Sequence, residues 1–298
     1  MASTEMQKAH GMWEALVPEL VSQTTTDGMR KTFDDFFFQF PVPQDVEFRS
    51  AQIGELGALW AGVRGHNADR VVLWLHGGGY CMGSAAGCRG LAGRIAHASD
   101  ARVLVLDYRR APEVPFPGAV EDATTAYRWL IAEGIRPSSI MIGGDSAGGG
   151  LALAAAIALR DSGDPLPAGV VSVSAFADLA VTGESVATNA ARDPIISREL
   201  LDNTAGMYLA GQDPRSPLAS PVHADLTGLP PLFLQVGSEE VLLDDSTRLA
   251  TKAKDAGVDV TLEVVDGAVH EWHVFASFLP EAQDAIARLG DFVRSRTP

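Results

Sequence analysis

The stretch Ile142-Gly143-Gly144-Asp145-Ser146-Ala147-Gly148-Gly149 decides the fold, because it places a serine at the centre of Gly-x-Ser-x-Gly between two different kinds of segment. The apolar run 139–142 precedes it, and the helix-forming residues 151–160 follow it. This order predicts a sharp strand-to-helix turn with Ser146 at its tip, where the flanking glycines let strand and helix approach closely. Ser146 is therefore a candidate nucleophile. A purely structural turn is the alternative in a chain with 30 glycines.

Short apolar runs rich in Val, Ile and Leu alternate with helix-length segments along most of the chain. This alternation predicts an α/β fold with a mostly parallel central sheet and helices on both faces. Because the runs are almost continuously apolar, we expect strands that are buried on both faces. The expected strands are 71–76, 102–107, 139–143, 169–174, 232–237 and 258–264. The expected helices are 87–98, 118–133, 147–161, 244–256 and 275–295, and residues 46–50 and 56–61 form a more polar antiparallel edge.

Two segments do not follow this alternation, residues 1 to about 45 and residues from about 179 to 222. The first has a helical pattern followed by a cluster of phenylalanines, and the second has a helical stretch with a Pro-rich exit. We expect the two together to form a helical cap over the strand ends, within a single domain that spans 1–298. The alternative is that the N-terminal helix only covers an edge of the sheet.

Composition limits the possible partners and cofactors. The 298 residues carry a formal net charge of -15, and Lys and Arg never cluster, so nucleic acid is not an expected partner. Neither a secretory signal nor an apolar run of membrane-spanning length is present, which favours a cytoplasmic protein without a membrane anchor. Cys81 and Cys88 lack zinc or redox spacing and the histidines lack ligand spacing, so we expect no metal and no cofactor.

A second motif, His76-Gly77-Gly78-Gly79-Tyr80, directly follows the expected strand 71–76. Glycines at this place free the backbone so that the N–H groups of Gly78 and Gly79 can point into one small volume. Together with the N–H of Ala147 they form a candidate oxyanion hole. His76 comes too early in the chain to be the base, and we interpret it as a residue that orients the loop or, alternatively, as a core histidine.

Candidates for the base and its acid partner lie near the C-terminus, in the order expected after such a serine. Residues 238–245 follow one late strand and include Glu239 and Glu240, which the residues alone do not distinguish. Residues 266–273 follow the next strand and contain two histidines, His270 and His273. Acidic residues at a helix start are usually favourable to its dipole, which is our interpretation of the pair at 244–245.

Taken together, these motifs resemble those of the bacterial hormone-sensitive lipase family of carboxylesterases, which has the α/β-hydrolase fold. The resemblance covers about residues 70–275. It rests on the two glycine motifs and on a third between them, Tyr108-Arg109-Arg110-Ala111-Pro112-Glu113 with Phe116-Pro117-Gly118-Ala119-Val120-Glu121-Asp122-Ala123. The family pattern selects Glu240 as the acid and His270 as the base. Two departures are Glu240, where most members carry Asp, and Tyr80, where many carry Phe or Trp.

The resemblance implies hydrolysis of carboxylic esters with short acyl chains, through an acyl-enzyme on Ser146 and without metal or cofactor. It implies supporting roles for His76, Gly77 and Asp145, and Asp145 is expected to take no part in proton transfer. We expect activity to fall as acid protonates His270 near the ordinary histidine pKa of about 6.5. The expected partner is a small-molecule ester, and a homodimer is possible because dimers are common among relatives.

Three other functions deserve comparison with an esterase. A trypsin-like protease shares Gly-Asp-Ser but needs its histidine and aspartate before the serine, in an all-β chain, so the order of residues excludes it. A hydrolase of another acyl bond, such as an amide or a lactone, could use the same residues. A non-catalytic small-molecule receptor on the same fold is the third, and the intact set of candidate residues argues against it.

Overall fold

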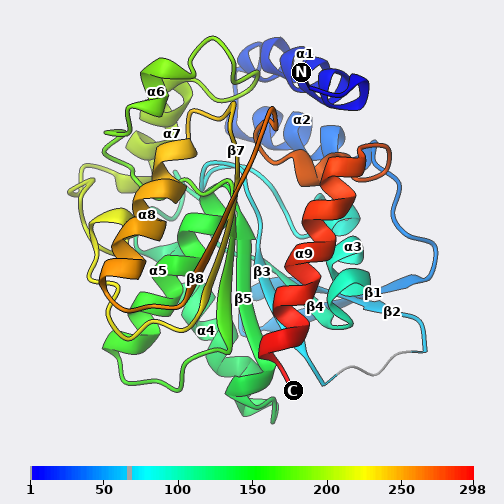
Figure 1. Cartoon of the computed structure of the whole chain (residues 1–298), viewed down its shortest axis with the longest axis vertical. Helices are drawn as coiled ribbons and strands as arrows, with labels where there is room; N and C mark the ends of the chain where they lie inside the picture. The colour runs from blue at the N-terminus through cyan, green and yellow to red at the C-terminus, as the bar shows by residue number, and fades with distance from the viewer. Residues whose placement is uncertain (1, 66–68) are drawn as a thin grey trace.

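The computed structural model describes residues 2–65 and 69–298, so Met1 and residues 66–68 of the expected single domain lie outside the described residues. Within those ranges eight strands form one sheet in the order β1-β2-β4-β3-β5-β6-β7-β8 (Figure 1). β1 (Val46–Ile53) and β2 (Leu56–Val63) pair antiparallel, and β2 is antiparallel to β4. All the other pairs are parallel. The predicted α/β-hydrolase fold with a mostly parallel sheet is confirmed.

The six parallel strands lie within two residues of their expected positions. They are β3 (Val71–Leu75), β4 (Arg102–Asp107), β5 (Ile140–Asp145), β6 (Gly169–Val173), β7 (Leu232–Gly237) and β8 (Val260–Val265). Every residue of β3, β5, β6 and β7 is buried, as their apolar composition predicts. The same expectation is wrong for β8, where Val264 is 46% exposed. β8 is the last strand of the sheet and has a neighbour on one side only.

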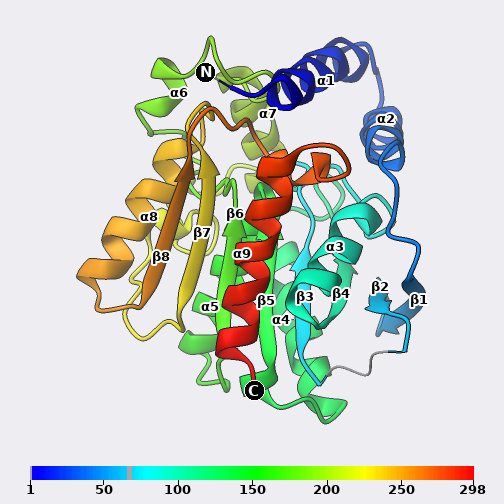
Figure 2. The ribbon, with the colours of Figure 1, turned by 45° about the vertical axis from the view of Figure 1, so that its right-hand side comes forward.

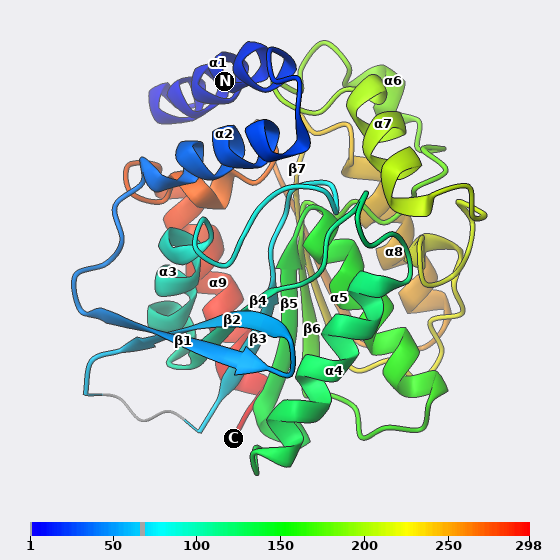
Figure 3. The ribbon, with the colours of Figure 1, turned by 180° about the vertical axis from the view of Figure 1, so that it is seen from behind.

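Helices cover both faces of the sheet. Figure 2 shows α3 (Arg89–Ser99) and α9 (Pro280–Arg296) together on one face. Seen from behind in Figure 3, α4 (Gly118–Ala132), α5 (Ala147–Asp161) and α8 (Leu243–Asp255) lie on the other. The helix expected at 275–295 begins later, at Pro280, because residues Trp272–Phe275 form a 3₁₀ turn and proline suits the first turn of a helix.

The two segments outside the alternation lie at the end of the sheet where the parallel strands finish (Figures 1 and 3). The first forms α1 (Thr4–Val21) and α2 (Thr26–Phe38). The second forms α6 (Ser185–Thr188), the expected helical stretch as α7 (Arg198–Leu209), and a 3₁₀ turn at Pro221–His223. Trp13 of α1 stacks on Phe36 of α2 at 4.6 Å between ring centroids and meets Phe275 edge-on at 5.5 Å. This aromatic contact joins α1 and α2 to the turn before α9.

Among the helices of the described ranges, none has both the length and the apolar character needed to cross a membrane.

Candidate active site

Ser146 lies between the last residue of β5 and the first residue of α5, as the glycine motif predicts. Its backbone angles are φ 52° and ψ -119°, a strained conformation for a residue with a side chain. A Cβ on Gly148 would lie 1.9 Å from the carbonyl oxygen of Leu75, and one on Gly144 would lie 2.2 Å from the carbonyl oxygen of Gly148. Glycine is therefore required at both positions, because backbone from the neighbouring strand and helix occupies the space.

The structure brings Ser146, His270 and Glu240 together from three loops at the carboxyl ends of β5, β8 and β7. The hydroxyl oxygen of Ser146 lies 3.1 Å from His270 Nε2, and His270 Nδ1 lies 2.9 Å from Glu240 Oε2. All three residues are buried, with Glu240 fully enclosed and Ser146 6% exposed. The arrangement can pass a proton from the serine to the histidine while the carboxylate holds the imidazole in place.

The competing candidates lie elsewhere. Glu239 is partly exposed, and its carboxylate lies 3.8 Å from the guanidinium of Arg192. His273 Nε2 lies 2.9 Å from Gln235 Oε1, and burial, together with the charges of Arg288 and His270, lowers the pKa of His273 to about 3. Neither Glu239 nor His273 has a hydrogen bond to Ser146 or His270 within the described chain.

Ser174, which the sequence analysis missed, holds the carboxylate of Glu240. Its hydroxyl donates to Glu240 Oε1 at 2.8 Å and accepts from the backbone N–H of Glu271 at 3.2 Å. The backbone N–H of Gly237 donates to the same Glu240 oxygen at 2.6 Å. Ser174 directly follows β6 and has φ 49°. The sequence placed Ser174 at the end of an expected strand, but that position alone does not predict which carboxylate its hydroxyl contacts.

His270 is a stronger base than the sequence predicts. Burial lowers its pKa, but the hydrogen bond with Glu240 and the charges of Glu271, Glu240 and Asp193 outweigh burial and raise the pKa to about 9. The pKa of His270 is therefore raised above the expected 6.5, because Glu240 and Asp193, which are distant in the sequence, and the adjacent Glu271 surround the ring.

The glycine motif presents backbone N–H groups beside Ser146. Gly78 and Gly79 have φ 115° and 59°, and both line the cavity that contains Ser146. A Cβ on Gly78 would lie 2.5 Å from the carbonyl carbon of Met82. No acceptor in the described chain pairs with the N–H groups of Gly78, Gly79 or Ala147. Three donors without partners near a serine hydroxyl can bind an oxygen that becomes negative.

The residues expected to support the site hold the glycine loop against the serine turn. His76 Nδ1 lies 2.8 Å from the carbonyl oxygen of Gly77, and its ring stacks on Tyr108 at 4.3 Å. The carboxylate of Asp145 accepts from the indole N–H of Trp74 at 2.6 Å and from the N–H of Gly77 at 2.8 Å. Asp145 therefore fixes the start of the glycine loop to the end of β5.

The fold is similar to that of known hydrolases. A model of the alpha/beta hydrolase fold family matches residues 72–274, about two thirds of the chain. The crystal structure of an esterase from the bacterial hormone-sensitive lipase family superposes on this chain with a TM-score of 0.96, at 46% identity and over 100% of both chains. The chain belongs to this family.

Other relatives of this hormone-sensitive lipase family member are also hydrolases. An acetyl-hydrolase of Streptomyces hygroscopicus is 50% identical over 246 residues, which are 82% of each chain. The esterase EstE5 superposes with a TM-score of 0.94 at 42% identity, over 99% of both chains. Family membership and these relatives together make this protein a carboxylic ester hydrolase.

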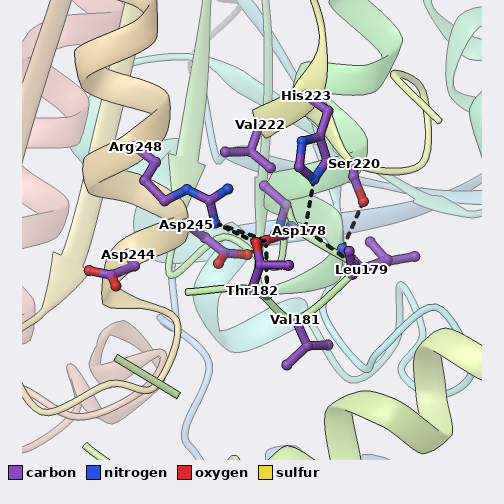
Figure 4. Close-up of polar contacts among 12 residues, drawn as sticks. Asp178, Leu179, Val181, Thr182, Ser220, Val222, His223, Asp244, Asp245 and Arg248 are labelled. Carbon is purple, nitrogen blue, oxygen red and sulfur yellow. Dashed lines mark hydrogen bonds and ion pairs between the residues drawn. The ribbon is translucent and has the colours of Figure 1, made fainter. Parts of the chain in front are cut away.

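A polar cluster lies beside the Glu240 loop and includes Asp244 and Asp245 (Figure 4). Both lie in the first turn of α8, as the dipole interpretation expects, and their side chains also bind other loops. Asp244 accepts from the N–H of Ser185 at 2.9 Å, and Asp245 accepts from those of Ala177 and Asp178 at 2.8 and 2.9 Å. Burial raises the pKa of Asp245 to about 8.

Asp178, next to Asp245 in the same cluster, is held by three side chains. Its carboxylate lies 2.8 Å from Arg248 Nη1 and 3.0 Å from His223 Nε2, and Thr182 also bonds it (Figure 4). Because Asp178 follows β6 and Arg248 lies on α8, the cluster joins these two elements. It thereby holds the start of α8, which follows the loop that carries Glu240.

The cavity at Ser146 has a volume of about 40 Å³ and mostly apolar walls. Trp13, Leu20 and Phe33 line it from α1 and α2, and Ile195, Leu201 and Thr204 line it from α7 and the preceding loop. Over residues 2–65 and 69–298, no group of three His, Cys, Asp or Glu side chains is arranged to hold a metal ion.

Proposed function

We propose that this ester hydrolase cleaves short-chain carboxylic esters with Ser146 as nucleophile, His270 as general base and Glu240 as its acid partner. The observation that carries the proposal is the unbroken series of contacts from Ser146 Oγ to His270 Nε2 at 3.1 Å and from His270 Nδ1 to Glu240 Oε2 at 2.9 Å. Burial of all three residues strengthens each interaction, because water competes less for it.

In the first half of the reaction, Ser146 Oγ attacks the ester carbonyl carbon while its proton passes to His270 Nε2. Glu240 holds the tautomer with a proton on Nδ1 and stabilises the imidazolium. The N–H groups of Gly78, Gly79 and Ala147 bind the oxyanion of the tetrahedral intermediate. The intermediate then expels the alcohol, which takes the proton from His270, and leaves the acyl group on Ser146.

In the second half, water attacks the acyl carbon and gives a proton to His270. The same N–H groups bind the second oxyanion, and collapse returns the proton to Ser146 as the carboxylic acid leaves. Asp145 already accepts two N–H bonds and has no contact with the Ser146 hydroxyl among the described hydrogen bonds, which supports a positioning role without proton transfer. His76 and Gly77 serve the same purpose on the glycine loop.

We further propose that residues from about 1 to 45 and from about 179 to 222 act as the cap of this site. Both segments supply walls of the cavity over Ser146. At about 40 Å³ the enclosed cavity is far below the range of about 300–1,000 Å³ for ligand pockets, which favours short acyl chains. The structure of the relative EstE5 was determined after soaking with p-nitrophenyl butyrate, an ester with a short acyl chain.

A series of p-nitrophenyl esters from acetate to palmitate tests the chain-length preference. We expect kcat/KM to be highest at acetate or butyrate and to fall steeply for longer chains, because the apolar walls enclose a limited volume. A maximum at palmitate would contradict the short-chain proposal and indicate a lipase.

A further inference from the structure

Glu271 is a buried acid beside the catalytic histidine to which the mechanism gives no role. The residue is 2% exposed and has φ 48°. Its Oε1 lies 3.8 Å from His270 Nε2, the atom that receives the serine proton, and the residue lines the cavity that contains Ser146. No described residue donates a hydrogen bond to this oxygen. A buried acceptor without a donor is costly, so its surroundings should explain it.

A second carboxyl group lies against Glu271. A Cβ added to Gly77 would lie 2.4 Å from Glu271 Oε1 and 2.6 Å from Asp145 Oδ2, so both oxygens pack on the same glycine. The two carboxyl oxygens therefore lie close to each other. Asp145 receives N–H bonds from Trp74 and Gly77, which stabilise its negative charge. Two carboxylates in one buried site cannot both be ionised without a large cost, and a shared proton removes it.

We propose that Glu271 and Asp145 hold one proton between them, with Glu271 as the neutral carboxylic acid that donates to the carboxylate of Asp145. This inference rests on the proposed function, because it concerns the charge that His270 experiences during the reaction. The shared proton gives the unpaired oxygen of Glu271 a partner. It also joins the His270 loop to the serine turn and, through Gly77, to the glycine loop, so Glu271 is a positioning residue.

The charges around Glu271 favour its neutral form. Burial raises its pKa well above the usual range, the charge of Asp145 raises it further, and the His270 charge opposes this. The other titratable groups that face it are Glu240, after β7, which also raises its pKa, and Cys88, before α3. The Cys88 thiol is neutral, because burial raises its pKa as well.

A neutral Glu271 matters for catalysis in two ways. The charge of Glu271 is one of the causes that raise the pKa of His270 to about 9, so a neutral Glu271 leaves that pKa lower and less of the histidine protonated and inactive near neutral pH. An ionised Glu271 would also place a negative charge beside the site where the oxyanion forms. The shared proton leaves Glu240 as the ionised partner in contact with His270.

The pH dependence of kcat/KM in Glu271→Gln tests the proposal, because glutamine keeps the shape and the donor but cannot ionise. We expect the midpoint of the acid limb to stay within about 0.3 pH unit of wild type, since no charge is removed. We also expect the variant to lack an alkaline decline that wild type shows as the pair loses its proton. A midpoint lower by about one unit or more would overturn the proposal, because that is the effect of removing a real charge at this distance. Glu239→Gln is the matched control, as it removes a charge outside the site.

Infrared spectroscopy separates this proposal from the proposed function. A neutral buried carboxyl group has a C=O stretching band that a carboxylate lacks. The difference spectrum between wild type and Glu271→Gln at neutral pH should contain that band, and subtraction removes the contribution of Asp245. A difference spectrum with only carboxylate bands would overturn the shared proton, whether or not the protein hydrolyses esters.

Discussion

Replacing Ser174 by alanine removes one hydrogen bond from the carboxylate of Glu240 and one from the backbone N–H of Glu271. The hydroxyl donates to Glu240 Oε1 at 2.8 Å, inside a fully buried site. Alanine keeps the Cβ, so the backbone strain at φ 49° is the same in both proteins. The perturbation therefore acts on the orientation and charge stabilisation of the catalytic acid.

The magnitude follows from the contacts that remain. A hydrogen bond to a charged group is worth about 1.5–3 kcal/mol, which corresponds to about 10- to 100-fold in rate. The N–H of Gly237 still donates to the same oxygen at 2.6 Å. We therefore expect the lower end of this range, a fall in kcat of about tenfold. KM should change little, because Ser174 does not line the cavity at Ser146.

Steady-state hydrolysis of p-nitrophenyl butyrate measures this change. Ser172→Ala is the matched control, because Ser172 is fully buried two residues earlier on β6, and its hydroxyl has no hydrogen-bond partner among the described residues. We expect Ser172→Ala to keep the wild-type kcat. If Ser174→Ala has the same kcat as Ser172→Ala, Glu240 does not depend on the Ser174 hydroxyl and the reasoning is refuted.

Three further predictions concern the glycine loop, the histidine and the polar cluster. Gly77→Ala should lower the free energy of unfolding by about 1–3 kcal/mol, measured by urea denaturation, because its Cβ would overlap the carboxyl oxygens of Glu271 and Asp145. A raised His270 pKa means that kcat/KM should fall as pH drops through a midpoint above about 6.5 and no higher than about 9; a midpoint below 6 would contradict this. The raised pKa of Asp245 means that the folded state keeps a proton that the unfolded state releases between about pH 4 and 8, so folding loses stability as pH rises through that window. The free energy of unfolding of Asp245→Asn should rise relative to that of wild type by up to about 1.4 kcal/mol per pH unit between about pH 4 and 8. Equal pH slopes of the two free energies of unfolding would refute the assignment.

Much of the sheet could be predicted because burial on both faces leaves a local signal. The run 232–237 is apolar at most positions and coincides with β7. The serine turn was predicted for a similar reason, since the glycines around Ser146 indicate that the backbones of strand and helix approach each other closely. β8 was predicted in position but not in burial, because the sequence does not say which strand lies at the edge of the sheet.

The site was only partly predictable from local sequence. Glu239 and Glu240 are adjacent and chemically alike, and only the direction of each side chain separates them. The roles of Ser174 and Glu271 were missed because the two residues meet through a tertiary contact and are 97 positions apart in the chain. The raised pKa of His270 has partly the same origin, since Glu240 and Asp193 come from other loops, while Glu271 is its neighbour in the chain.

The account depends most on Ser146 as the nucleophile, and Ser146→Ala tests that assignment directly. The measurement is the rate of p-nitrophenyl butyrate hydrolysis by wild type and variant at equal concentration, with circular dichroism to show that both are folded. We predict that the variant loses essentially all serine-dependent turnover and keeps the wild-type spectrum. Near-wild-type hydrolysis by a folded Ser146→Ala protein would contradict the proposed catalytic site.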